Sequence, residues 1–142
     1  MKTLNYFLVI SLICLSSTCK KDDENDYHKI IKFINNTNME LFVHQSVGYP
    51  DTTFARGEFP NPIVSEINRI LPNETNTRAL EARYSYEEKF KYSYDTLMIF
   101  VFDGQVLKTT PWETVQQDYL VLKRYDLSLE DLKQNNWTIT YP

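Results

Sequence analysis

Glycine and cysteine are scarce in this chain, which has three glycines and two cysteines among its 142 residues. With glycines only at positions 48, 57 and 104, the sequence contains neither a glycine-rich loop for phosphates nor a Gly-x-Ser-x-Gly turn. Histidine is limited to His28 and His44, and no Cys-x-x-Cys or His-Glu-x-x-His spacing occurs. These absences predict no metal site, no cofactor and no catalytic residues of a known short motif.

The chain also lacks an excess of positive charge. Fifteen basic residues face 19 acidic residues, so the formal net charge is −4 at neutral pH. Nucleic-acid recognition needs a basic face, and the composition therefore argues against DNA or RNA as a partner. With 42% apolar residues and only six prolines, the chain is not of low complexity and has the composition of one globular domain with a terminal extension.

No apolar run is long enough for a transmembrane helix. The longest run covers residues 4–15, where ten of twelve side chains are apolar. Twelve helical residues rise about 18 Å, which is short of the roughly 30 Å hydrocarbon core of a bilayer. Because Lys2 precedes this run, the pattern predicts a secretory signal peptide.

The letters LSSTC at residues 15–19 place an aliphatic residue and three small residues before a cysteine. This order resembles the box of bacterial lipoproteins. The resemblance implies that residues 1–18 are a lipoprotein signal peptide, and that Cys19 is the lipid attachment site, acylated with chains such as palmitate. Two or more acyl chains would hold the protein durably on a membrane. The alternative is an ordinary signal peptide followed by a chance cysteine.

Charged residues dominate the segment after Cys19, which runs KKDDEND at residues 20–26. Such a segment cannot be buried, so residues 19–26 are expected to be a lipidated cysteine and a disordered tether. A lysine followed by acidic residues at this place resembles the surface-export signal of Bacteroidetes lipoproteins. The resemblance implies an outer-membrane protein that faces the cell surface or, alternatively, the periplasm.

Residues 27–142 are predicted to form a single domain that is mainly β. The expected strands are apolar or alternating runs bounded by polar turns, at residues 30–34, 39–44, 97–102, 105–107, 120–125 and 137–141. The polar residues between the first two runs predict a hairpin, and the unbroken run at 97–102 predicts a strand buried on both faces. In the last run, Trp137, Ile139 and Tyr141 should face the core.

Two short helices are predicted near the C-terminus. Thr110 stands three residues before Glu113, with a proline between them, and Ser128 stands three residues before Asp131. A hydroxyl and an acid at this spacing stabilise a helix start. Strands dominate without regular alternation with helices, so the predicted fold is a small antiparallel β-sandwich, immunoglobulin-like in outline, with two short helices.

The last third of the chain contains TTPWE at 109–113, DYLVLKRYDLSLEDL at 118–132 and NWTITYP at 136–142. These segments resemble the C-terminal region of small uncharacterised lipoproteins of Bacteroides and related Bacteroidetes. That family carries no assigned activity. The resemblance therefore implies a place in the cell envelope and no reaction.

An aromatic segment, YSYEEKFKYSY at residues 84–94, is the first candidate for ligand binding. If the segment is extended, its rings share one face because they stand at even positions: Tyr84, Tyr86, Phe90, Tyr92 and Tyr94. An exposed aromatic face could stack on sugar rings or on peptides. The alternatives are that this face lines the core, or that a turn near Glu87 and Glu88 makes a hairpin.

A second candidate is the proline-rich stretch at residues 46–72, because long loops in compact domains are often functional. Its candidate ligand contacts are Tyr49, Phe54, Arg56 and Phe59. The alternative is a proline-stiffened crossover between sheets.

Two threonines follow an aspartate in a way that resembles the O-glycosylation sites of Bacteroidetes envelope proteins. They are Thr52 and Thr96. His44, next to Val43 in an expected strand, is interpreted as a surface or edge residue rather than a ligand.

These features predict a binding or scaffolding module for a glycan, a peptide or an envelope protein. Alternatives are an accessory subunit of an envelope complex and a hydrolase that uses carboxylates. Glu87 and Glu88 are adjacent, and adjacent side chains on a strand would point to opposite faces. No nucleophile and base are evident, so the sequence predicts no enzyme.

Overall fold

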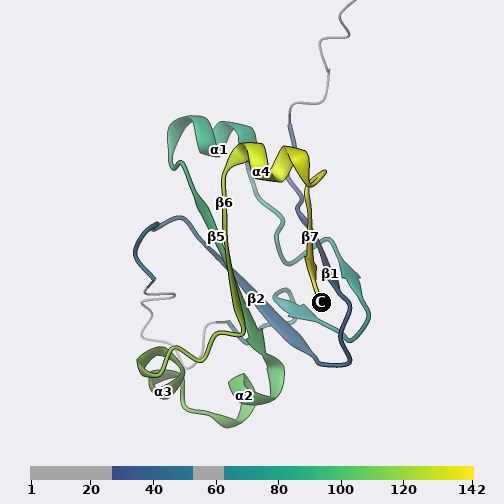
Figure 1. Cartoon of the computed structure of the whole chain (residues 1–142), viewed down its shortest axis with the longest axis vertical. Helices are drawn as coiled ribbons and strands as arrows, with labels where there is room; N and C mark the ends of the chain where they lie inside the picture. The colour runs from purple at the N-terminus through teal and green to yellow at the C-terminus, as the bar shows by residue number, and fades with distance from the viewer. Residues whose placement is uncertain (1–26, 53–62) are drawn as a thin grey trace, which may run out of the picture.

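The computed structural model describes residues 27–52 and 63–142 (Figure 1). Within these ranges the chain forms seven strands and four short helices. The strands are β1 (Lys32–Asn35), β2 (Leu41–Ser46), β3 (Arg69–Ile70), β4 (Thr75–Asn76), β5 (Leu97–Asp103), β6 (Lys123–Leu127) and β7 (Thr138–Tyr141). The helices are α1 (Tyr86–Tyr92), α2 (Gly104–Thr109), α3 (Trp112–Gln117) and α4 (Leu129–Gln134). The prediction of a mainly β domain is confirmed for this part of the chain.

The strands make two sheets, in the orders β4-β1-β7 and β3-β2-β5-β6. Every named pair is antiparallel except β1 with β7, which run parallel with Phe33 opposite Ile139. Side chains from both sheets share one hydrophobic cluster, since Phe33 and Ile139 belong to it together with Val43 and Ile99. Burial of this apolar surface holds the sheets together.

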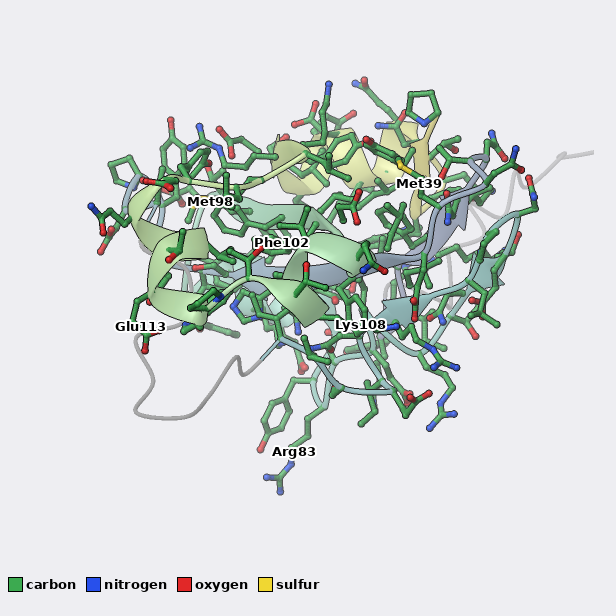
Figure 2. All side chains as sticks on the ribbon, turned by 90° about the horizontal axis from the view of Figure 1, so that it is seen from below. Met39, Arg83, Met98, Phe102, Lys108 and Glu113 are labelled. Carbon is green, nitrogen blue, oxygen red and sulfur yellow. The ribbon has the colours of Figure 1, made fainter. Side chains whose placement is uncertain are left out.

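Strand β5 is buried along six consecutive residues, as the sequence predicts. Its alternate side chains enter two clusters, because successive residues of a strand point to opposite faces. Val101 faces the cluster shared with the smaller sheet, whereas Phe102 faces a second cluster that includes Trp112 of α3. Figure 2, seen from the α2 and α3 end, shows Phe102 beside these helices.

Helices α1 and α4 lie at one end of the molecule and α2 and α3 at the other (Figure 1). The described chain begins at the α1 and α4 end. None of the helices in the described ranges has the length and apolar character needed to cross a bilayer.

The two predicted helices are present. Helix α4 has the expected capping box: Asp131 N donates to Ser128 Oγ over 3.1 Å, and Ser128 N donates to Asp131 Oδ2 over 2.8 Å. Helix α3 starts one residue later than predicted, with Pro111 rather than Thr110 at the N-cap. The final strand is confirmed from Thr138 onward, while Trp137 precedes it with a φ of 54°. Trp137 and Ile139 are buried as predicted, Thr140 is exposed, and Tyr141 is only half-buried.

The predicted hairpin between residues 30–34 and 39–44 is wrong. β1 and β2 belong to different sheets, and the polar connection crosses between them. Asn35 explains this path: its buried Nδ2 donates to Met39 O over 2.7 Å and to Leu71 O over 2.9 Å. These bonds fix a crossover instead of a tight turn.

The predicted return strand at 105–107 is also wrong, because these residues lie in α2. The Asp103 carboxylate accepts from Gln105 N and Val106 N, at 2.7 and 3.2 Å, and so caps this helix. The strand expected at 120–125 is shifted, and β6 begins at Lys123.

Candidate binding surface around helix α1

Residues 84–94 contain a helix, so the extended conformation on which a single aromatic face depends is not present, and the alternative of a hairpin turn near Glu87 and Glu88 is wrong. Ser85 is the N-cap, and its Oγ accepts from Glu88 N over 3.2 Å. Acidic residues occupy the first turn and lysines the last, which suits the helix dipole. The serine at 85 and the glutamate at 88 are the capping-box spacing that could have identified this helix from the sequence.

The helix distributes its aromatic rings around its axis, because each residue turns by about 100°. Tyr86 is completely buried, and its hydroxyl donates to Leu80 O over 2.8 Å. Burial raises the pKa of Tyr86. Tyr86 is therefore a core residue and not a ligand contact, so the alternative that this aromatic face lines the core holds for Tyr86 but not for Tyr84 and Tyr92.

Tyr84 and Tyr92, by contrast, are 57% and 74% exposed and line the same depression. Glu88 and Tyr92 stand four residues apart and lie on one side of α1, and Tyr84 lies just before the N-cap of this helix. The depression has a volume of about 250 Å³, and Lys89 and Ser93 complete its lining. Burial lowers the pKa of Lys89. Two predicted ligand contacts thus meet at a surface that also offers charged groups.

A second depression adjoins the first at Ser93. Its volume is about 210 Å³, and its lining includes Tyr49, Tyr94 and Thr96. Tyr49 is 52% exposed, whereas burial raises the pKa of Tyr94 to about 12. The enclosed Tyr94 hydroxyl has no hydrogen-bond partner within residues 27–52 and 63–142. We call these two adjoining depressions the tyrosine surface.

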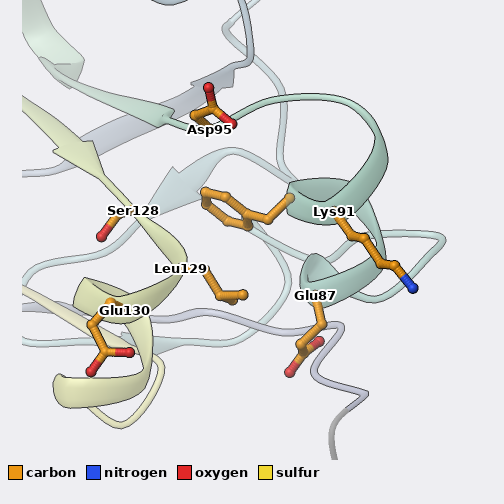
Figure 3. Close-up of a pocket in the computed structure, with 7 residues that line it drawn as sticks. Glu87, Lys91, Asp95, Ser128, Leu129 and Glu130 are labelled. Atoms are coloured by element: carbon orange, nitrogen blue, oxygen red, sulfur yellow. The ribbon is translucent and has the colours of Figure 1, made fainter.

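The opposite side of α1 carries a different cavity, with a volume of about 340 Å³, between α1 and α4 (Figure 3). We call it the acidic groove. Its lining consists of Glu87, Phe90, Lys91, Asp95, Ser128, Leu129 and Glu130. The sequence did not reveal this groove, because α4 follows α1 by more than thirty residues in the chain.

His28, near the start of the described residues, binds Glu87 of α1. Its ring Nδ1 lies 2.6 Å from Glu87 Oε1, and its backbone N donates to Glu87 Oε2 over 2.9 Å. The ring stacks on Trp137, with centroids 4.2 Å apart and planes inclined by 12°. These partners are supplied by the fold itself, so His28 has a structural role.

Several other sequence candidates take separate positions. Phe54, Arg56 and Phe59 lie outside the described residues. Thr52 and Thr96 are half-buried, and their glycosylation remains a prediction. His44 is half-buried on β2, opposite Phe100 of β5. It follows the two residues of β2 that pair with β3, and burial lowers its pKa.

The acidic residues do not form a metal centre in the described part of the chain, where no group of three or more ligating side chains was found. Glu87 and Glu88 lie on different sides of α1, since Glu87 lines the acidic groove and Glu88 the tyrosine surface. This pair therefore cannot act together on one substrate.

Comparison with known proteins identifies no relative of this chain: no protein-family model, curated protein or solved structure gives a significant match.

Proposed function

We propose that the protein is a binding module that holds a saccharide against Tyr84 and Tyr92. The supporting observation is that both rings are mostly exposed and line one depression, although neighbouring Tyr86 is completely buried. Exposed aromatic rings gathered at one depression are common where a ligand covers them.

The chemistry around the rings favours a polar ligand with flat apolar faces. Sugar rings have such faces, and their hydroxyls need hydrogen-bond partners at the edges. Glu88, Lys89 and Ser93 supply acceptors and donors between the two tyrosines. Tyr49, across Ser93, would extend the contact to a further sugar unit. A peptide and an envelope protein are the other ligands that the sequence predicts for this module.

The proposal is tested by incubating a glycan array with the full chain in detergent micelles. We expect binding that falls about tenfold or more in a variant with both Tyr84→Ala and Tyr92→Ala. Each aromatic contact contributes about 0.5–1.5 kcal/mol, and about 1.4 kcal/mol corresponds to tenfold in affinity. Tyr119→Ala removes an equally large, 42% exposed ring after α3 and serves as the control. Equal binding by the two variants would contradict the proposal.

We also propose that the chain is a lipoprotein anchored to the outer membrane through Cys19, with its domain at the cell surface. The support is the LSSTC box and the charged tether, together with the resemblance to Bacteroides lipoproteins. Cells fed labelled palmitate should label the chain but not a Cys19→Ser variant. Protease treatment of intact cells should degrade it, and full protection would instead indicate the periplasmic face.

For the scaffold we propose a β-sandwich with an immunoglobulin-like outline. Its support is the cluster shared by the two sheets and the antiparallel pairing of every strand pair in the larger sheet. In this arrangement the tyrosine surface lies at the end formed by α1, where connections between elements gather.

One observation favours a second function, that of an accessory subunit. Leu120 and Leu122, in the connection between α3 and β6, are 36% and 42% exposed. Apolar side chains gathered in this way can belong to a contact with a partner. Cross-linking in native membranes should recover such a partner with the wild-type chain, and a variant with serine at both positions should lose it.

A further inference from the structure

The acidic groove combines an apolar floor with a rim of carboxylates. Phe90 of α1 and Leu129 of α4 supply the apolar part, and both are only half-buried. Glu87, Asp95 and Glu130 surround them. Figure 3 shows Leu129 in the middle of the groove, with Asp95 and Glu130 on two sides of it.

The single lysine in the lining does not neutralise these acids. The Lys91 ammonium lies over the ring of Tyr92, 5.0 Å from its centroid, on the side of the tyrosine surface. Figure 3 shows its nitrogen directed away from the groove. Lys91 therefore contributes its aliphatic stem to the groove and its charge elsewhere.

Two of the three carboxylates are without a cation partner in the described ranges. Glu87 is held by His28, whereas Asp95 and Glu130 take part in none of the ion pairs found among these residues. Among the residues that the structure describes, the Glu130 carboxylate accepts one bond, from the amide of Gln134 over 3.1 Å. The groove thus presents negative charge beside exposed apolar surface.

We propose that the acidic groove binds an exposed basic segment of a partner protein, which inserts a lysine or arginine side chain. The aliphatic stem would cover Phe90 and Leu129, while the cationic head would lie between Asp95 and Glu130. The aliphatic stem of a lysine or arginine matches the apolar floor, and its cationic head matches the carboxylates of the rim. This site lies on the other side of α1 from the depression of Tyr84 and Tyr92, although Asp95 also lines the depression beside Tyr49.

Size and charge favour this occupant over others. Drug-sized ligands occupy pockets of about 300–1,000 Å³, so a groove of about 340 Å³ suits one or two side chains. Membrane surfaces and nucleic acids carry negative charge and would be repelled by the rim. A single basic side chain from a protein segment matches both the volume of the groove and the negative charge of its rim.

The experiment measures fluorescence anisotropy of a labelled peptide, acetyl-Gly-Lys-Leu-Lys-Gly-amide, with the full chain in detergent micelles. A peptide with glutamate in place of both lysines is the matched ligand control. We expect the lysine peptide to bind at least about tenfold more tightly. The difference should shrink between about 0.01 M and about 1 M salt, as the Debye length falls from about 30 Å to about 3 Å.

The variants separate this site from the tyrosine surface. Glu130 is exposed and lines the acidic groove but not the tyrosine surface. Glu130→Gln should therefore weaken peptide binding about threefold or more. Glu113→Gln changes an exposed acid of α3 at the far end of the molecule and should leave it unchanged (Figure 2). A Tyr84→Ala variant, which keeps the contact between Lys91 and Tyr92, should bind the peptide normally, even if the saccharide proposal fails.

Three results would overturn the proposal. They are equal affinity for the lysine and glutamate peptides, equal effects of Glu130→Gln and Glu113→Gln, and equally tight binding of free butylamine, which would indicate a small-amine site. Both substitutions are at exposed positions and keep side-chain size, so each variant should fold, which circular dichroism verifies.

Discussion

The two sides of helix α1 differ in chemistry although they belong to the same seven residues. One side exposes Tyr92 beside Glu88 and Lys89, whereas the other presents Glu87 with the half-buried Phe90. Buried Tyr86 lies on the inward side and fixes the rotation of the helix. The comparison teaches that a short helix can separate an aromatic surface from an acidic one, because neighbouring residues point in different directions.

The largest effect is expected from Tyr86, the buried residue that fixes the rotation of α1. Tyr86→Ala should lower the free energy of unfolding by about 3–5 kcal/mol, because it leaves a cavity in the core. Tyr86→Phe should cost about 1–3 kcal/mol, since Leu80 O loses the bond from the hydroxyl. Urea denaturation measures both values. If Tyr86→Ala is as stable as the wild type, α1 is not fixed by this side chain.

Loss of the His28 contacts should have an intermediate effect. His28→Ala removes the stacking on Trp137 and the side-chain contact with Glu87. We expect about 1–2 kcal/mol lower stability, since a stacked pair contributes about 0.5–1.5 kcal/mol beyond its buried area. Thermal unfolding gives the value. His28→Phe retains a ring for stacking and should recover part of the loss; no recovery would mean that stacking contributes little.

Ser128→Ala tests the groove without touching α1. It removes the capping box of α4, which should cost about 1 kcal/mol. Because α4 carries Leu129 and Glu130, peptide binding should weaken while saccharide binding stays the same. The affinities for the lysine peptide and for the saccharide, both measured on one preparation, distinguish these outcomes. A parallel loss of both would mean that the two sides of α1 are not independent.

The smallest expected effect is a pH dependence of the free energy of unfolding. It should affect the two sides of α1 equally. Burial lowers the pKa of His44 below its usual 6.5. The unfolded chain then takes up a proton at a higher pH than the folded chain, so stability falls as the pH drops through about 6.5. The melting temperature of the His44→Gln variant should therefore fall less than that of the wild type between about pH 7.5 and about pH 5.5. An equal loss in the variant would exclude His44 as the cause.

Local signals predicted three elements of the C-terminal half of the domain, although the strand expected at 105–107 is a helix and the strand expected at 120–125 is shifted. Six apolar residues identified β5, the serine and aspartate of α4 identified its start, and the alternation of Trp137 and Ile139 identified β7. Each signal lies within one short segment. The mainly β class followed from these strands.

Contacts between distant segments could not be predicted in this way. Asn35 resembles a turn residue, yet its side chain bonds Leu71 and directs a crossover. The tyrosines at 84–94 show a period of two, but Ser85 and Glu88 form a helix start that outweighs it. The acidic groove depends on α4 packing near α1, which no local pattern reports.

The most direct test of the proposed function is an NMR titration of the full chain in micelles with the strongest binder from the glycan array. We expect the amide signals of Tyr84, Tyr92 and Ser93 to shift with saturation, while those of Leu129 and Glu130 stay in place. Shifts confined to the acidic groove, or no shift near either tyrosine, would contradict a saccharide site on the tyrosine side of α1.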